Sequence, residues 1–189
     1  MQSAILLHGK PDKEEYYDPA VPSCSNHHWF PWLQKQLLVH GIHAQTPEVP
    51  DAWNPQYALW QREFERFGIT PKTLLVGHSC GGGFLVRWLS EHPDVRVGKA
   101  VLVAPSLGID WDAGDFFNFT IGPQLAARTA GLVIFESDDD RPAIHEAVKK
   151  LRAGISGVRH REFQGHGHFT LRSMGTTEFP ELLEELLAP

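Results

Sequence analysis

The sequence predicts an α/β protein, a three-layer sandwich in which a mostly parallel sheet of about six strands lies between helices. Short apolar runs alternate along the chain with segments whose apolar residues recur at helical spacing. The runs at 99–104 and 131–135 are almost wholly apolar, which is typical of parallel strands buried on both faces. Because the 189 residues contain no repeat or long linker, we expect a single domain over residues 1–189.

The first part of the chain supplies three strands of this sheet. Strands are predicted at 4–7, 42–45 and 74–76, and helices at 29–38 and 57–67. Pro31 is compatible with the first turn of its helix, and glycines at 41 and 68 end the two helices. The polar, proline-containing segment 10–26 is predicted as a loop.

The second part supplies the other three strands. A helix follows the 74–76 strand and ends near Glu91, before Pro93. Further strands are predicted at 99–104, 131–135 and 158–163, and helices at 142–152 and 177–187. Residues 106–122 are predicted to be irregular and aromatic, and we expect no large lid between the strands on either side of them.

Composition narrows the classes of partner. With 42% hydrophobic and 21% charged residues, the chain has the composition of a soluble globular protein. Its net charge of −6 gives no sign of a nucleic-acid or anionic-membrane partner. The N-terminal apolar run is too short for a signal peptide or a membrane span. Cys24 and Cys80 are predicted to be free thiols, so we expect a cytoplasmic protein.

The most informative motif is Gly-His-Ser-Cys-Gly at residues 77–81, a G-x-S-x-G pentapeptide. It lies between a predicted strand and a predicted helix, the setting in which this motif forms a nucleophile elbow. The tight turn lifts the serine oxygen off the strand end, and glycines stand where the backbone comes too close for a Cβ. We therefore predict Ser79 as a nucleophile. Cys80 is not expected to serve, because the elbow places residue 79 at its apex.

A serine nucleophile needs a base, and the base needs an acid that orients it. In a parallel sheet, ligand sites form at the carboxyl ends of the strands, and the acid should follow the serine in the chain. The run Ser-Asp-Asp-Asp at 137–140 follows the 131–135 strand. At most one of the three aspartates can orient the base. We choose Asp140, with Asp139 as the alternative.

The base is expected after the last strand. Residues 164–169 read Gln-Gly-His-Gly-His-Phe and follow the 158–163 strand. The two glycines allow the backbone to turn so that one imidazole points inward. His168 is predicted as the base, with His166 as the alternative.

An oxyanion hole requires two backbone N–H donors directed at the developing negative charge. The amide of Cys80, at the start of the helix directly after Ser79, is one expected donor. The second should come from the loop after the first strand, which makes Gly9 or Lys10 the expected donor.

Together these residues resemble the small serine hydrolases of the RBBP9/YdeN family, compact members of the α/β-hydrolase superfamily. The resemblance covers most of the chain and is carried by segments 7–10, 28–33, 77–81, 137–140 and 167–169. It implies a minimal α/β-hydrolase fold without a large lid, and hydrolytic activity. In that family the acid is the second aspartate of an S-x-D-D pattern and the base precedes a phenylalanine, which implies Asp140 and His168.

Two departures from the family pattern affect the site. The family has a D-x-x-V-P run after the acid, whereas residues 140–144 read Asp-Arg-Pro-Ala-Ile, so Asp139 remains an alternative. The loop at 10–26 is longer than the glycine-rich family loop, so we expect a reshaped acyl pocket. Four aromatic residues are possible lining residues for it, although core packing is the better explanation of each: Trp29, Trp111, Phe116 and Phe117.

The function predicted from these features is hydrolysis of a small, water-soluble carboxylic ester or amide through an acyl-enzyme on Ser79, without a cofactor. The alternative is a catalytically weak protein of the same fold that binds a protein partner. Metal binding by the histidines is not expected. His27 and His28 should point to opposite sides of an extended chain, and no carboxylate or cysteine follows His166 and His168 at metal-ligand spacing.

Overall fold

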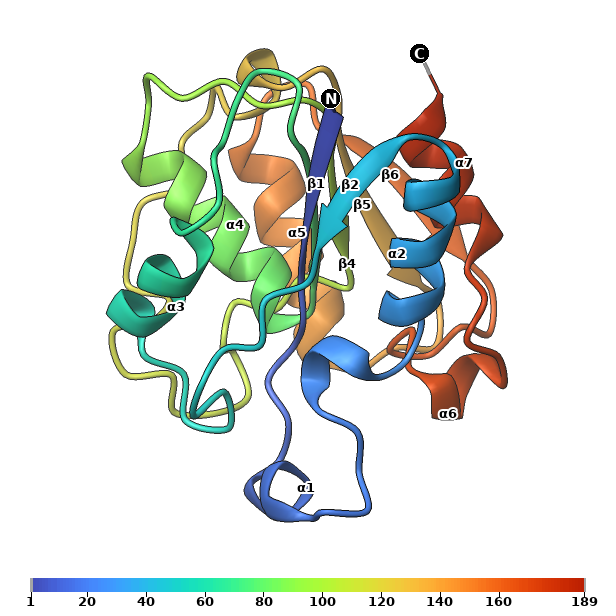
Figure 1. Ribbon diagram of the computed structural model, residues 1–189. Helices are drawn as coiled ribbons and strands as arrows, with labels where there is room; N and C mark the ends of the chain where they lie inside the picture. Colours follow the sequence, from blue (N-terminus) through green and yellow to red (C-terminus); the bar gives the residue numbers. More distant parts are fainter. Residues whose placement is uncertain (1, 189) are drawn as a thin grey trace.

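The computed structural model describes residues 2–188, which form a six-stranded parallel sheet with helices on both faces (Figure 1). The strands are β1 (Gln2–Leu7), β2 (Ile42–Gln45), β3 (Leu74–His78), β4 (Ala100–Val103), β5 (Leu132–Ser137) and β6 (Arg159–Phe163). Their order in the sheet is β2-β1-β3-β4-β5-β6. The predicted α/β class and strand number are confirmed, and the sheet is parallel in every pairing rather than mostly so.

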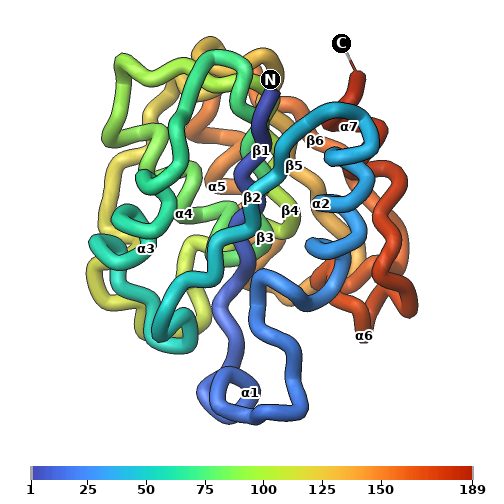
Figure 2. The backbone as a smooth tube through the Cα atoms, in the orientation of Figure 1, coloured from blue at the N-terminus to red at the C-terminus, as the bar shows by residue number. Residues whose placement is uncertain are grey.

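Five longer helices cover the sheet. They are α2 (Phe30–Val39), α3 (Tyr57–Phe64), α4 (Cys80–Glu91), α5 (Pro142–Gly154) and α7 (Pro180–Leu187). Figure 2 shows α2 and α7 on one face and α3, α4 and α5 on the other. The helices α2, α4, α5 and α7 turn buried apolar residues towards the sheet, and α3 packs against α4. The core therefore forms one layer on each side of β1, β3, β4 and β5.

Two short helices lie in connections where the sequence predicts none. The segment 10–26, predicted as a loop, contains α1 (Lys13–Tyr17) and the 3-10 turn η1 (Cys24–Asn26). No residue of α1 is buried, so no apolar periodicity signals this helix. The second, α6 (Leu171–Met174), follows β6 and ends at Gly175, which has a left-handed φ of 69°.

Two predicted helix boundaries differ from the observed ones by three residues, more than the others do. The helix predicted at 57–67 ends at Phe64 and continues only as turns. The final helix begins at Pro180 rather than at residue 177, because proline fits the first turn but has no N–H to continue a helix that began upstream.

The connection between β4 and β5 contains no lid helix among residues 104–131; its one helical element is the 3-10 turn η2 (Ala126–Arg128). The expectation of a fold without a large lid is confirmed. None of the helices within residues 2–188 has the length and apolar character needed to cross a membrane.

Candidate active site

The nucleophile elbow is present between β3 and α4. Ser79 has φ 52° and ψ −116°, a conformation that residues with a Cβ adopt only when their surroundings enforce it. Its amide donates to the Val103 carbonyl at 2.9 Å, and its own carbonyl accepts from the amides of Gly83 at 3.2 Å and Ser106 at 2.9 Å. These bonds to β4, to α4 and to the segment after β4 hold the strained residue in place.

The two glycines of the motif stand where a side chain cannot fit. A Cβ on Gly77 would lie 2.6 Å from the backbone of Gly81, and a Cβ on Gly81 would lie 2.5 Å from the carbonyl oxygen of His8. The turn from β3 into α4 is therefore packed directly against itself and against the end of β1. This is the physical reason for glycine at both positions.

A histidine and an aspartate from neighbouring loops meet Ser79. The His168 Nε2 atom lies 2.9 Å from Ser79 Oγ, and its Nδ1 atom lies 2.9 Å and 3.1 Å from the two carboxylate oxygens of Asp140. The Asp140 side chain is 0% exposed and acts only as an acceptor when ionised. The imidazole accordingly donates Nδ1–H to Asp140 and presents the Nε2 lone pair to the serine hydroxyl.

The two alternative residues occupy other positions. The Asp139 carboxylate accepts hydrogen bonds from the Ser137 hydroxyl at 2.6 Å and from the Gly167 amide at 2.7 Å, and the first of these lowers its pKa. His166 Nδ1 pairs with the Gln164 carbonyl at 3.0 Å. Within residues 2–188, neither side chain hydrogen-bonds to His168. Both shape the two loops that carry Asp140 and His168.

Two buried side chains to which the sequence reasoning gave no such role hold the His168 loop by its backbone. His78 Nε2–H donates to the His168 carbonyl at 2.8 Å, and Trp29 Nε1–H donates to the Phe169 carbonyl at 2.9 Å. Burial places the pKa of His78 well below its ordinary value, so this imidazole is neutral. The signal available for His78 was its place directly before the serine of the motif.

The end of β1 lies against the serine. A Cβ on Gly9 would be 3.1 Å from the Ser79 Cβ. His8 Nδ1–H donates to the Gly9 carbonyl at 2.7 Å, and Nε2 accepts from the Val49 amide at 3.0 Å, so the imidazole fixes this loop. Among residues 2–188 the amides of Cys80, Gly9 and Lys10 have no acceptor. Cys80 is the first residue of α4, where amide groups lack partners in the helix.

A pocket of about 550 Å³ opens over Ser79 and His168. Its walls come from the segment after β1, from α1, from the residues that precede α2, and from α6, and include Lys10, Glu15, His27, His28, Phe30 and Arg172. The four aromatic residues considered as lining are not among its lining residues. Trp29 and Phe116 are fully buried in the core, as the packing explanation expects.

The histidine pair beside the pocket is arranged differently from the sequence expectation. His27 and His28 do not point to opposite sides; their rings stack with centroids 4.0 Å apart. The reason is that His28 has a left-handed φ of 54°, so the chain is not extended there. His28 Nδ1 accepts from the Leu171 amide at 3.2 Å, and burial lowers the His28 pKa to about 4.

Both cysteines are free thiols, as predicted. Cys80 is buried beneath the elbow and burial raises the pKa of its thiol, which disfavours the reactive thiolate. Burial also raises the pKa of Cys24, at the pocket wall, to about 12. At neutral pH both thiols are therefore protonated, the less nucleophilic form of cysteine.

The parallel sheet, the strained serine between β3 and α4, and the pocket above it define the class of the protein: an α/β-hydrolase fold with a serine at its nucleophile elbow. A family model described as serine hydrolase matches residues 19–188. The chain therefore belongs to the serine hydrolase family.

Known proteins support this classification. The chain is 29% identical over 186 residues to YdeN of Bacillus subtilis (strain 168), covering 92% of this chain and 94% of YdeN. The crystal structure of the ydeN gene product from B. subtilis matches with a TM-score of 0.81 and 25% identity, over 97% of this chain and 96% of that one. These two findings confirm the resemblance to the YdeN family.

More distant structures share the fold. The crystal structure of a pyrethroid hydrolase from Sphingobium faniae JZ-2 matches with a TM-score of 0.61 over 97% of this chain and 94% of that one. Because the two sequences are only 14% identical, this match shows a common fold and nothing about the substrate. The predicted minimal α/β-hydrolase fold is thus confirmed.

Proposed function

We propose that this protein cleaves a small carboxylic ester or amide through an acyl-enzyme on Ser79, with His168 as general base and acid and Asp140 as the residue that orients it. The observation that carries the proposal is the continuous pair of hydrogen bonds from Ser79 Oγ through the His168 imidazole to the buried Asp140 carboxylate. This is the geometry that activates a serine hydroxyl.

In the proposed reaction, the Ser79 oxygen attacks the substrate carbonyl carbon while its proton passes to His168 Nε2. The imidazolium is stabilised by Asp140, which stays ionised. His168 then gives the proton to the departing alcohol or amine as the acyl–oxygen or acyl–nitrogen bond breaks. A water molecule attacks the acyl-enzyme, gives its proton to His168, and the carboxylic acid leaves as Ser79 recovers its hydrogen.

The negative charge on the carbonyl oxygen needs fixed donors during both attacks. We assign the Cys80 amide as one donor, and the amide of Gly9 or Lys10 as the other. Their lack of an acceptor within residues 2–188 and the contact of Gly9 with Ser79 support this assignment. No cofactor is needed for these steps.

The pocket favours a small-molecule substrate over the alternative of a partner-binding protein. Its volume of about 550 Å³ lies in the usual range for small-molecule sites, and the Ser79–His168 pair lines it. A protein that only binds a partner does not need a strained serine bonded to an oriented base.

Reaction with a fluorophosphonate probe tests the proposal, because the probe traps activated serine hydroxyls. We expect labelling at Ser79, located by peptide mass spectrometry, and no labelling of the Ser79→Ala variant. Ser156→Ala removes an exposed serine outside the pocket and should label like the parent protein. A folded parent protein that fails to label, or that labels elsewhere, contradicts the proposal and favours the partner-binding alternative.

A further inference from the structure

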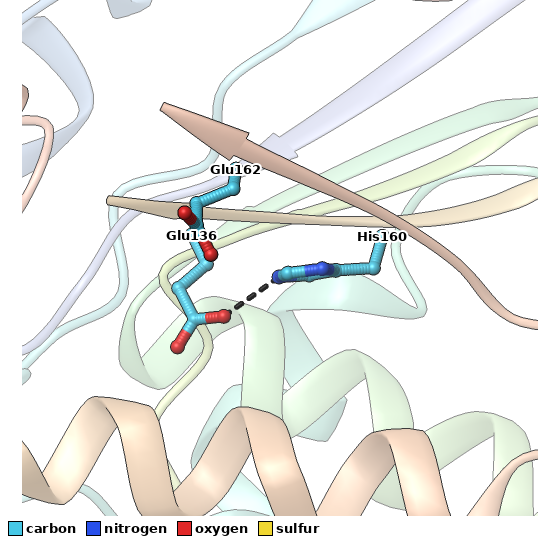
Figure 3. Close-up of side chains that lie close together, drawn as sticks. All are labelled: Glu136, His160 and Glu162. Atoms are coloured by element: carbon cyan, nitrogen blue, oxygen red, sulfur yellow. Dashed lines mark hydrogen bonds and ion pairs between the residues drawn. The ribbon is translucent and has the colours of Figure 1, made fainter. Parts of the chain in front are cut away.

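A group of metal-ligand side chains lies at the β5–β6 edge of the sheet, on its α5 face. Glu136 is on β5, and His160 and Glu162 are on β6. One potential ligand atom from each lies within 4.8 Å of the others, and Figure 3 shows the three side chains gathered together. The strand register explains the arrangement, because Glu136 pairs directly with Glu162 and His160 is two residues away on the same side of β6.

The negative charges of Glu136 and Glu162 repel each other unless a positive charge lies near both. Like charges directly opposite one another on neighbouring strands are destabilising. Glu136 is only 8% exposed, and both of its oxygens are occupied: Oε1 by His145 Nδ1 at 2.7 Å and Oε2 by His160 Nε2 at 2.6 Å. Glu162, by contrast, has no hydrogen-bond or ion-pair partner within residues 2–188, although it faces this group.

We propose that Glu136, His160 and Glu162 bind one divalent transition-metal ion, and that Zn²⁺ is a suitable ion. One imidazole nitrogen and two carboxylate oxygens are common zinc ligands, and three protein ligands leave a position for water. The two carboxylates balance the double positive charge. An imidazole ligand favours a transition metal over Mg²⁺ or Ca²⁺, which take oxygen ligands.

Binding requires a small local change. The present Glu136–His160 contact of 2.6 Å is a hydrogen bond, and a metal would replace it with two bonds of about 2.1 Å from a neutral His160 and the carboxylate. Glu162 is exposed at the edge strand, so the ion can enter from solvent past this side chain.

His145 is the positioning residue of this site. It extends from α5 and donates Nδ1–H to Glu136 Oε1, which leaves the other oxygen of that carboxylate directed at His160. Histidine and carboxylate partners of this kind orient metal ligands and strengthen binding. The site therefore joins α5, β5 and β6.

The location gives the ion a structural role, because its three ligands lie outside the pocket over Ser79. Glu136 directly precedes Ser137, whose hydroxyl accepts from the His166 amide at 2.9 Å. The Asp138 carboxylate accepts from the Gly165 amide at 2.8 Å. An ion that joins β5 and β6 directly before these contacts would stabilise the paired loops that carry Asp140 and His168. This departs from the sequence-based expectation of no metal, which considered other histidines.

Calorimetric titration of the full-length, chelator-treated protein with Zn²⁺ tests the site. We expect one ion per chain, and affinity reduced at least about tenfold in Glu162→Gln, because one of three ligands is lost. Glu178→Gln changes an exposed carboxylate outside the cluster and should bind like the parent protein. His27→Gln examines the stacked histidine pair as a competing site and should also leave binding unchanged.

Thermal unfolding gives a second measurement that does not depend on hydrolysis. Zn²⁺ should raise the Tm of the parent protein and not that of Glu162→Gln, because an ion bound only to the folded state stabilises it. Circular dichroism checks that the variant folds. The proposal is overturned if the parent protein does not bind Zn²⁺, if Glu162→Gln binds like the parent, or if His27→Gln removes the binding. Fluorophosphonate labelling of Ser79 in the metal-free parent protein tests the proposed hydrolysis separately.

Discussion

Replacing Asp140 by asparagine tests the proposed acid with almost no change of shape. The Arg141 amide donates to Asp140 Oδ1 at 2.7 Å, so the asparagine oxygen should keep that position. The new NH₂ group would then replace Oδ2, 2.9 Å from His168 Nδ1. Two donors cannot face each other, so the imidazole would shift its proton to Nε2 and lose the lone pair that accepts the Ser79 proton.

The loss expected from this wrong tautomer is about 10⁴-fold in kcat. At 1.36 kcal/mol for each factor of ten, this corresponds to about 5.4 kcal/mol of transition-state stabilisation. The assay is steady-state hydrolysis of p-nitrophenyl acetate, together with the rate of fluorophosphonate labelling. Both measurements report the reactivity of the serine hydroxyl.

Asp139→Asn is the matched control. Its oxygen Oδ1 can still accept from Ser137 and from the Gly167 amide, and it does not contact His168, so we expect activity within about tenfold of the parent. The reasoning is refuted if Asp140→Asn retains activity while Asp139→Asn loses it, because Asp139 would then be the acid.

Three further predictions concern the supporting structure. Gly81→Ala places a Cβ 2.5 Å from the His8 carbonyl oxygen and should lower the free energy of unfolding in urea by about 3 kcal/mol; an unchanged midpoint would contradict the close packing. His78→Phe keeps a ring but leaves the His168 carbonyl without its donor, so it should cost about 1–3 kcal/mol and slow fluorophosphonate labelling; a parent-like labelling rate would exclude a positioning role. His28 has a folded-state pKa of about 4 against 6.5 when unfolded, so the unfolded chain binds more protons between these values and stability should fall as the pH falls through them. His28→Gln should weaken that dependence in urea unfolding measured across the interval, and an identical pH profile would show that other groups cause it.

Local patterns account for most of the fold. The strand predicted at 42–45 coincides with β2, because short-range apolar alternation and the preceding Gly41 define it without reference to other elements. The segments that form β4 and β5 could be predicted because each is a nearly continuous apolar run. The short helices α1 and α6 were missed because neither has a buried residue, and both form part of the pocket wall.

The residues of the candidate site differ in whether local sequence or contacts between distant loops identify them. Ser79 could be predicted because the elbow is a local motif with glycines at the points of close approach. Which aspartate faces His168 could not be decided by counting residues. Asp138, Asp139 and Asp140 share one turn, and only hydrogen bonding to the neighbouring loop separates their directions.

Neighbouring residues were enough to predict the order along the chain of the six strands and the five longer helices, the serine elbow, and the two loops that carry an acid and a base. Three features could be found only in the folded chain: the pocket walls, the support of the His168 loop by His78, and the group formed by Glu136, His160 and Glu162. Those features depend on the register of β5 against β6 and on the packing of segments that are far apart in the chain. Local periodicity carries no information about such contacts.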